Sequence, residues 1–104
     1  MRKSIPSREV TPWGVADSVT HYGPGIAFYT TPSHGGFKLE EEQLAKLERK
    51  HGAVKTFCGQ RGWFEEDCDW AYVATAFPML FTERELDCAG STLECLKSRK
   101  AVVA

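Results

Sequence analysis

Two turn sequences on either side of a short apolar run most constrain how this chain can fold. Gly23-Pro24-Gly25 and the Pro-Ser-His-Gly-Gly segment at 32–36 contain glycines, which can adopt the positive φ of tight turns. Residues 26–31 between them are rich in β-branched and aromatic side chains, which favour strands. Residues 19–22 and 37–39 can supply the two outer strands. This pattern predicts an antiparallel meander of three strands.

The segment after the meander predicts a first helix over residues 40–51. It begins with three glutamates, which suit the positive end of the helix dipole, and Gly52 follows it as a stop signal. A conventional N-cap is missing, because Glu40 occupies the position where Ser or Thr is preferred. Leu44 and Leu47 form a narrow apolar stripe, so this helix should cover an edge of the core.

Two more helices and one short strand are expected in the rest of the chain. Residues 53–57 could form the strand. The segment 65–77 predicts a second helix that begins at its first or second residue and ends before Pro78. The first turn of that helix is acidic and the remainder is apolar nearly all round, which is typical of a buried central helix. The capping box Thr82–Glu85 then opens a third helix, which Gly90 should bend or split.

The length and the two ends of the chain indicate a single domain. A chain of 104 residues can bury about 60–65% of its unfolded surface around one core. Residues 1–12 are charged and lack periodicity, so we expect a flexible lead-in, then a globular domain over 13–97 and a frayed tail over 98–104. The expected fold class is α+β: a small antiparallel meander of about three strands packed on a buried central helix, with two further helices.

Charge and hydropathy argue against several classes of partner. The formal net charge is −1, and the basic clusters lie at the two ends of the chain, so we expect no direct binding of nucleic acid. No stretch approaches the roughly 18 apolar residues of a membrane span, and the N-terminus lacks an apolar stretch of signal-peptide length. We therefore expect a cytoplasmic protein that does not contact membranes and needs no cofactor.

The four cysteines are expected to be reduced and mostly buried. Cys58, Cys68, Cys88 and Cys95 form no CxxC pair, and their spacings match no common zinc motif. On one helix, Cys88 and Cys95 would be separated by about 10.5 Å, which is beyond disulfide reach. The only pair to consider for a disulfide is Cys58 with Cys68.

Several motifs together resemble one known family. The resemblance covers about residues 13–90, and its two central blocks, TPSHGG and EEDCDWA, are specific rather than compositional. The family is a domain of unknown function found in proteins of bacteriophages, prophages and plasmids. The motifs are WGxxDS at 13–18, PGIxFYxTPSHGGFKL at 24–39, GWFEEDCDWA at 62–71, and an AFPxLFTxEE-like segment at 76–85 that Arg84 interrupts.

The resemblance implies a setting rather than an activity. It implies a mobile-element origin and the cytoplasm of a bacterial host, and from these an accessory or counter-defence role. The chain departs from the family pattern at Glu40, where a helix-capping Ser is expected, and in the tail after Gly90. Neither departure touches the two central blocks.

Residues 65–69 contain four carboxylates and one thiol, which could take part in chemistry. Cys68 could be a nucleophile, but the surrounding carboxylates oppose thiolate formation, so we favour a packing role. Glu65 or Glu66 could share a helix face with Asp69 and bind a metal ion together with His34. Capping of the helix start explains the same carboxylates and is favoured, so no metal is expected.

His34 lies in the glycine-rich turn and is the second candidate for a functional role. The turn could bind an anion through its backbone N–H groups. We favour a turn with positive φ, in which the histidine bonds across to the acidic segment, and we expect a contact from His34 to Asp67 or Asp69. The three tryptophans are expected in the core, and Trp63 is the exception to consider because glycine and charge flank it.

Two functions follow from these candidates. The favoured one is a non-catalytic protein-binding accessory protein, which binds a host or phage protein and could inhibit CRISPR–Cas or another host nuclease system through an acidic and aromatic surface. The alternative is a small metal-dependent or histidine/carboxylate hydrolase centred on His34, Glu66, Asp67 and Asp69. The oligomeric state stays open. The expected binding residues are Trp63, Glu65, Glu66, Asp67, His34, Glu40 and Glu41.

Overall fold

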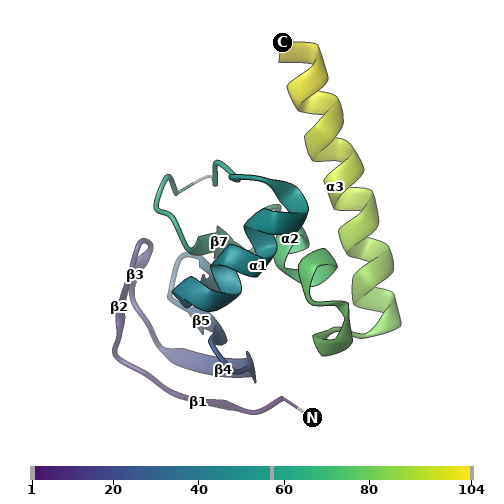
Figure 1. Cartoon of the computed structure of the whole chain (residues 1–104). Coiled ribbons are helices and arrows are strands. Elements are labelled where there is room, and N and C mark those ends of the chain that lie inside the picture. The colour runs from purple at the N-terminus through teal and green to yellow at the C-terminus, as the bar shows by residue number, and fades with distance from the viewer. Residues whose placement is uncertain (1, 57, 104) are drawn as a thin grey trace.

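Five antiparallel strands form the main sheet of this α+β fold, in the order β1-β4-β5-β6-β7 (Figure 1). The computed structural model describes residues 2–56 and 58–103, with side chains up to Lys97. The predicted meander of three strands is confirmed as β4, β5 and β6, and one further strand lies on each side of it. The strands are β1 (Ser4–Pro6), β4 (Ser18–Gly23), β5 (Ile26–Thr30), β6 (Gly35–Leu39) and β7 (Trp63–Glu65), and a separate hairpin joins β2 (Val10–Thr11) to β3 (Gly14–Val15).

The sheet separates a large core from a small one. On one face Phe37 pairs with Phe28 and Phe64 across neighbouring strands, and these side chains contact the helices. On the other face Val19 and Tyr29 form a second cluster, against which Trp63 packs. Because side chains alternate between the two faces of a strand, the residue after Phe64 points to the second face.

Three helices lie on the side of the first face, and the first two of them pack directly on the sheet. They are α1 (Glu41–His51), α2 (Trp70–Ala76) and α3 (Glu83–Val103), and a 3₁₀ turn, η1 (Pro78–Leu80), follows α2. The expected central helix is α2, in which four consecutive residues, 71–74, are buried. α3 packs against α2 through Ala89, Leu93 and Leu96, and its C-terminal part extends beyond the sheet (Figure 1).

The expected start of the second helix is wrong. Residues 63–65 form β7 instead, residues 66–69 form a turn, and α2 begins at Trp70. The reason is tertiary: the strand that buries Phe64 opposite Phe37 continues to Glu65, which pairs with Gly36 in the sheet instead of starting the helix. Asp69 directly precedes α2 but makes no side-chain cap bond, and the first turn of α2 contains no acidic residue, so the expected capping of this helix by Asp69 is not observed.

Three smaller expectations also differ from the structure. Residues 53–56 form no strand, and Phe57, which belonged to the same expectation, lies outside the described residues. α3 continues through Gly90 without a break, because its neighbours Ala89 and Leu93 pack against the core. The backbone of α3 also continues to Val103, over the residues where we expected fraying.

All four cysteines are free, as expected, but they are less buried than expected. Cys58 and Cys68 are half-buried, and Cys88 and Cys95 are exposed on α3. Ala89 and the leucines of α3 form its packed side, which leaves Cys88 and Cys95 facing away from the core.

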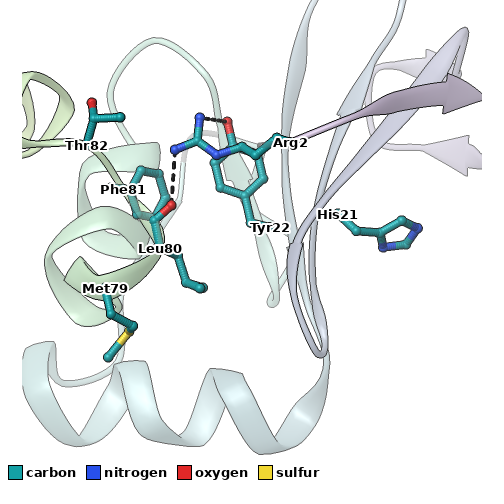
Figure 2. Close-up of a pocket in the computed structure, with 7 residues that line it drawn as sticks. All are labelled: Arg2, His21, Tyr22, Met79, Leu80, Phe81 and Thr82. Atoms are coloured by element: carbon teal, nitrogen blue, oxygen red, sulfur yellow. Dashed lines mark hydrogen bonds between the residues drawn. The ribbon is translucent and has the colours of Figure 1, made fainter.

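Arg2 attaches the N-terminal segment, where we expected a flexible lead-in, to α3. Its guanidinium forms two hydrogen bonds with the carboxylate of Glu85, at 2.6 and 3.0 Å, and it lies 4.0 Å from the ring centroid of Tyr22. It also donates to the carbonyl oxygen of Leu80 at 3.0 Å (Figure 2). Glu85 has a second role in the predicted capping box, in which it bonds reciprocally with Thr82. These contacts join β1 and the start of α3, two elements far apart in the sequence.

The bond from Arg2 predicts a pH-dependent stability. The guanidinium lowers the pKa of Glu85 to about 2, so the contact stabilises the fold above the ordinary carboxyl pKa of about 4.3 and is lost as the pH falls toward 2. We expect Glu85→Gln, which retains a capping-box side chain, to reduce the free energy of unfolding by about 1 kcal/mol at pH 7 and by much less at pH 2. Urea denaturation at both pH values measures this difference. An equal loss at both pH values, or an equal loss in the exposed control Glu83→Gln, would contradict it.

Gly36 predicts a steric effect in the sheet. A methyl group at position 36 would collide with the ring of Trp13 and with the carbonyl oxygen of Phe64. We expect Gly36→Ala to destabilise the protein by about 2 kcal/mol or more. The matched control is Gly90→Ala, because that position has open space and a helical backbone, and it should stabilise by up to about 1 kcal/mol. Thermal unfolding of the two variants tests the contrast, and similar melting temperatures would refute it.

Candidate functional site

The candidate site lies where the two sequence blocks meet, at one end of β6 and β7. Glu65 is the last residue of β7 and pairs with Gly36, so it lies close to the turn that carries His34. The backbone N–H of Glu66 donates to the carbonyl oxygen of Gly35 at 2.9 Å, which extends the pairing between the two segments by one residue. Asp67 follows in the turn between β7 and α2. Sheet pairing therefore brings residues about thirty positions apart into one cluster.

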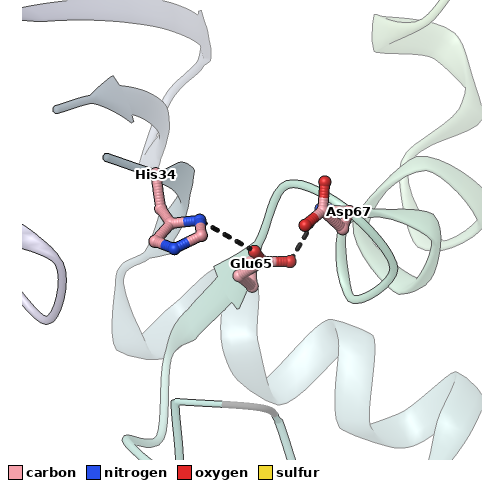
Figure 3. A group of neighbouring side chains, drawn as sticks. All are labelled: His34, Glu65 and Asp67. Carbon is pink, nitrogen blue, oxygen red and sulfur yellow. Dashed lines mark hydrogen bonds and ion pairs between the residues drawn. The ribbon is translucent and has the colours of Figure 1, made fainter. Parts of the chain in front are cut away.

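Three side chains of this cluster converge on one another (Figure 3). His34 Nδ1 lies 3.7 Å from Glu65 Oε2, and the backbone N–H of Asp67 donates to Glu65 Oε1 at 2.7 Å. One nitrogen or oxygen atom from each of His34, Glu65 and Asp67 lies within 4.8 Å of the others. Glu65 is only 8% exposed, whereas His34 and Asp67 are exposed. The cluster is thus a buried carboxylate with two solvent-facing neighbours.

The turn around His34 is fixed by hydrogen bonds rather than by glycine conformation. The hydroxyl of Thr31 donates to the carbonyl oxygen of His34 at 2.6 Å, and the backbone N–H of His34 donates to the same hydroxyl at 3.1 Å. Neither Gly35 nor Gly36 has a positive φ, so the expected reason for these glycines is wrong. Gly36 instead gives room to the ring of Trp13, which packs directly over it.

An aromatic wall stands beside the cluster. The rings of Trp13 and Trp63 meet edge to face with centroids 5.7 Å apart, and Tyr29 lies 5.6 Å from Trp63. Trp63 is half-buried, as the other two tryptophans are, and Lys38 lies over its ring at 5.4 Å. Trp13 lines the pocket, whereas Trp63, which we expected to be exposed and to bind a partner, is not among the described residues that line it. The pocket has a volume of about 480 Å³, and the residues that line it are Pro12, Trp13, His34, Cys58, Gln60, Glu65, Asp67 and Cys68.

The electrostatics of the pocket favour a positive ligand. Burial raises the pKa of Glu65 above its ordinary value, and the negative charges of Asp67 and Glu66 act in the same direction. The backbone N–H of Asp67 opposes this rise by stabilising the carboxylate. A cation in the pocket would relieve the repulsion among the three carboxylates.

The predicted contact between the two blocks is present, with a different partner. A donor atom of His34 lies within 4.8 Å of one of Asp67, but the contact at 3.7 Å, from Nδ1 to Oε2, is with Glu65. Asp69, the other expected partner, is buried at the start of α2 and is not among the described residues that line the pocket. Glu66 is exposed and lies beside Gly35.

The two acidic segments of the sequence do not form one surface. Glu40 and Glu41 follow the far end of β6, which is about 13 Å long at the usual strand rise. Glu41 also binds Arg61, with an Oε2–Nη1 distance of 2.8 Å, so its charge is already compensated. The binding residues expected at 40 and 41 are therefore separate from the pocket.

Sequence reasoning missed part of the pocket lining. Pro12, Cys58 and Gln60 reach the pocket through long-range packing, for which the sequence offers no local signal. The position of Glu65 had one signal, which is that the two residues before it, Trp63 and Phe64, are aromatic and therefore favour a strand.

Comparison with known proteins gives a family without an activity. Within the described residues, no helix is both long and apolar enough to cross a membrane. Searches of curated proteins and of solved structures found no match to this chain. A family model described as Domain of unknown function (DUF7007) matches residues 6–101. Because this match spans most of the chain, the protein belongs to the DUF7007 family.

Proposed function

We propose that this protein is a non-catalytic, protein-binding accessory protein of a phage or other mobile element, and that it binds its partner through the acidic pocket. One observation carries the proposal. Glu65 and Asp67 lie beside Trp13 in a recess of about 480 Å³, and the pocket thus combines negative charge with an aromatic wall. Recesses that combine an aromatic wall with a few polar groups are typical of binding sites.

The chemistry of the pocket indicates a basic partner. An arginine or lysine side chain could pair with the carboxylates and lie against the ring of Trp13 in a cation–π contact. Exposed Glu66 adds negative charge nearby and would steer a basic surface toward the pocket. Basic grooves are common on proteins that handle nucleic acids, and the TPSHGG and EEDCDWA blocks resemble a family of phages and plasmids. We therefore include inhibition of CRISPR–Cas or another host nuclease system as the specific form of this role.

The alternative, a small hydrolase, has weaker support. It requires His34, Glu66, Asp67 and Asp69 to act together. The described residues that line the pocket include only two of these four, since Glu66 and Asp69 are not among them. The thiols of Cys58 and Cys68 share the pocket with two carboxylates, which oppose thiolate formation.

Charge reversal at the pocket tests the proposed function. We expect Glu66→Lys with Asp67→Lys to weaken partner binding at least about tenfold, because both exposed carboxylates would then repel a basic surface. The partner is first captured from host lysate with the unchanged protein, then purified, and its affinity is measured by calorimetry. The matched control is Glu83→Lys with Asp87→Lys, two exposed carboxylates on α3, and it should bind as the unchanged protein does.

Two outcomes would overturn this proposal. One is that the unchanged protein captures no stoichiometric partner. The other is that the pocket variant, shown by circular dichroism to be folded, binds the partner as tightly as the α3 control.

A further inference from the structure

The three converging side chains of the pocket form a set of donor atoms that could bind a metal ion. His34 supplies an imidazole nitrogen, and Glu65 and Asp67 supply carboxylate oxygens. These atoms come from three segments: the turn before β6, the end of β7 and the turn before α2. Nitrogen and carboxylate donors of this kind are ligands of divalent transition metals in proteins.

The spacing of the donor atoms suits one ion. Metal–ligand bonds of about 2.0–2.2 Å in tetrahedral geometry place two ligand atoms of the same ion about 3.3–3.6 Å apart. His34 Nδ1 and Glu65 Oε2 are already 3.7 Å apart, and all three donor atoms lie within 4.8 Å of one another. His34 and Asp67 are exposed, so small rotations of their side chains can close the remaining gap.

The surroundings orient the central ligand and leave an open position. The backbone N–H of Asp67 binds one oxygen of Glu65 and so directs the other oxygen toward His34. Thr31 fixes the backbone of the turn that carries His34. The carboxylate of Glu65 has lost most of its contact with water, which an ion would replace, and the pocket provides space for a further ligand.

We propose that His34, Glu65 and Asp67 bind one zinc ion at the mouth of this pocket, with a fourth position open to the pocket. Magnesium and calcium fit this set less well, because they prefer six or more oxygen ligands. The ion and a basic side chain would use the same carboxylates, so their binding is mutually exclusive. The site goes beyond the proposed function, since zinc binding needs no protein partner.

Zinc titration of the tag-free, metal-stripped and reduced protein tests this site. We expect about one zinc per chain by elemental analysis after gel filtration, and a melting temperature raised by at least about 4 °C at a zinc concentration 100-fold above the dissociation constant. Magnesium at the same concentration should give a much smaller shift. His34→Ala and Asp67→Asn change exposed side chains, so they should remain folded, and each should lower the zinc affinity by at least about 100-fold. Glu65→Gln should do the same.

Matched controls separate this site from general zinc binding. His21→Ala removes an exposed histidine from β4, and Glu42→Gln removes an exposed carboxylate from α1, so both should bind zinc as the unchanged protein does. Absence of zinc binding in the unchanged protein would overturn the proposal. Equal zinc affinity in His34→Ala, Asp67→Asn and the controls would also overturn it. So would a loss of binding confined to Cys58→Ser with Cys68→Ser, because the site would then consist of thiols. None of these results depends on capture of a protein partner, so the two proposals can fail separately.

Discussion

The pairing of β7 with β6 is the interaction on which the rest of this structure depends. It places Phe64 against Phe37 in the large core and Glu65 opposite Gly36 on the other face. Successive side chains of a strand point to opposite faces of the sheet. When Phe64 is buried on the face that the helices cover, Glu65 must therefore lie on the other face. Glu65 therefore lies beside His34 as a consequence of core packing. A slip of one residue in this register would expose Phe64 and move Glu65 away from the pocket.

Burial of Glu65 has a cost that the pocket partly offsets. A carboxylate removed from water needs hydrogen bonds or positive charge, and here it has one backbone N–H and a nearby imidazole. The neighbouring carboxylates of Glu66 and Asp67 work against it. This imbalance is the physical basis of both proposals, because a basic side chain or a metal ion would supply the positive charge that the pocket lacks.

The opposite end of the fold depends on a different charged contact. Arg2 joins the start of β1 to Glu85 at the start of α3 and packs over Tyr22. Since Glu85 also closes the capping box with Thr82, one carboxylate stabilises the helix start and attaches the first strand to it. The charges of Arg2 and Glu85 compensate each other, whereas the carboxylates in and beside the pocket all carry negative charge.

Several elements could be predicted from the local chemistry of the sequence. The meander followed from its turns and β-forming runs, α1 from its acidic start and Gly52, and the start of α3 from the capping box. The sequence also indicated that the TPSHGG and EEDCDWA blocks meet, through His34 and the acidic segment. Three features could be seen only in the folded chain. Residues 63–65 form a strand, Arg2 binds Glu85, and Trp13 lines the pocket, whereas Trp63 is not among the described residues that line it. The physical reason is that each of these outcomes depends on burial or charge pairing between residues far apart in the chain, which local propensity does not encode.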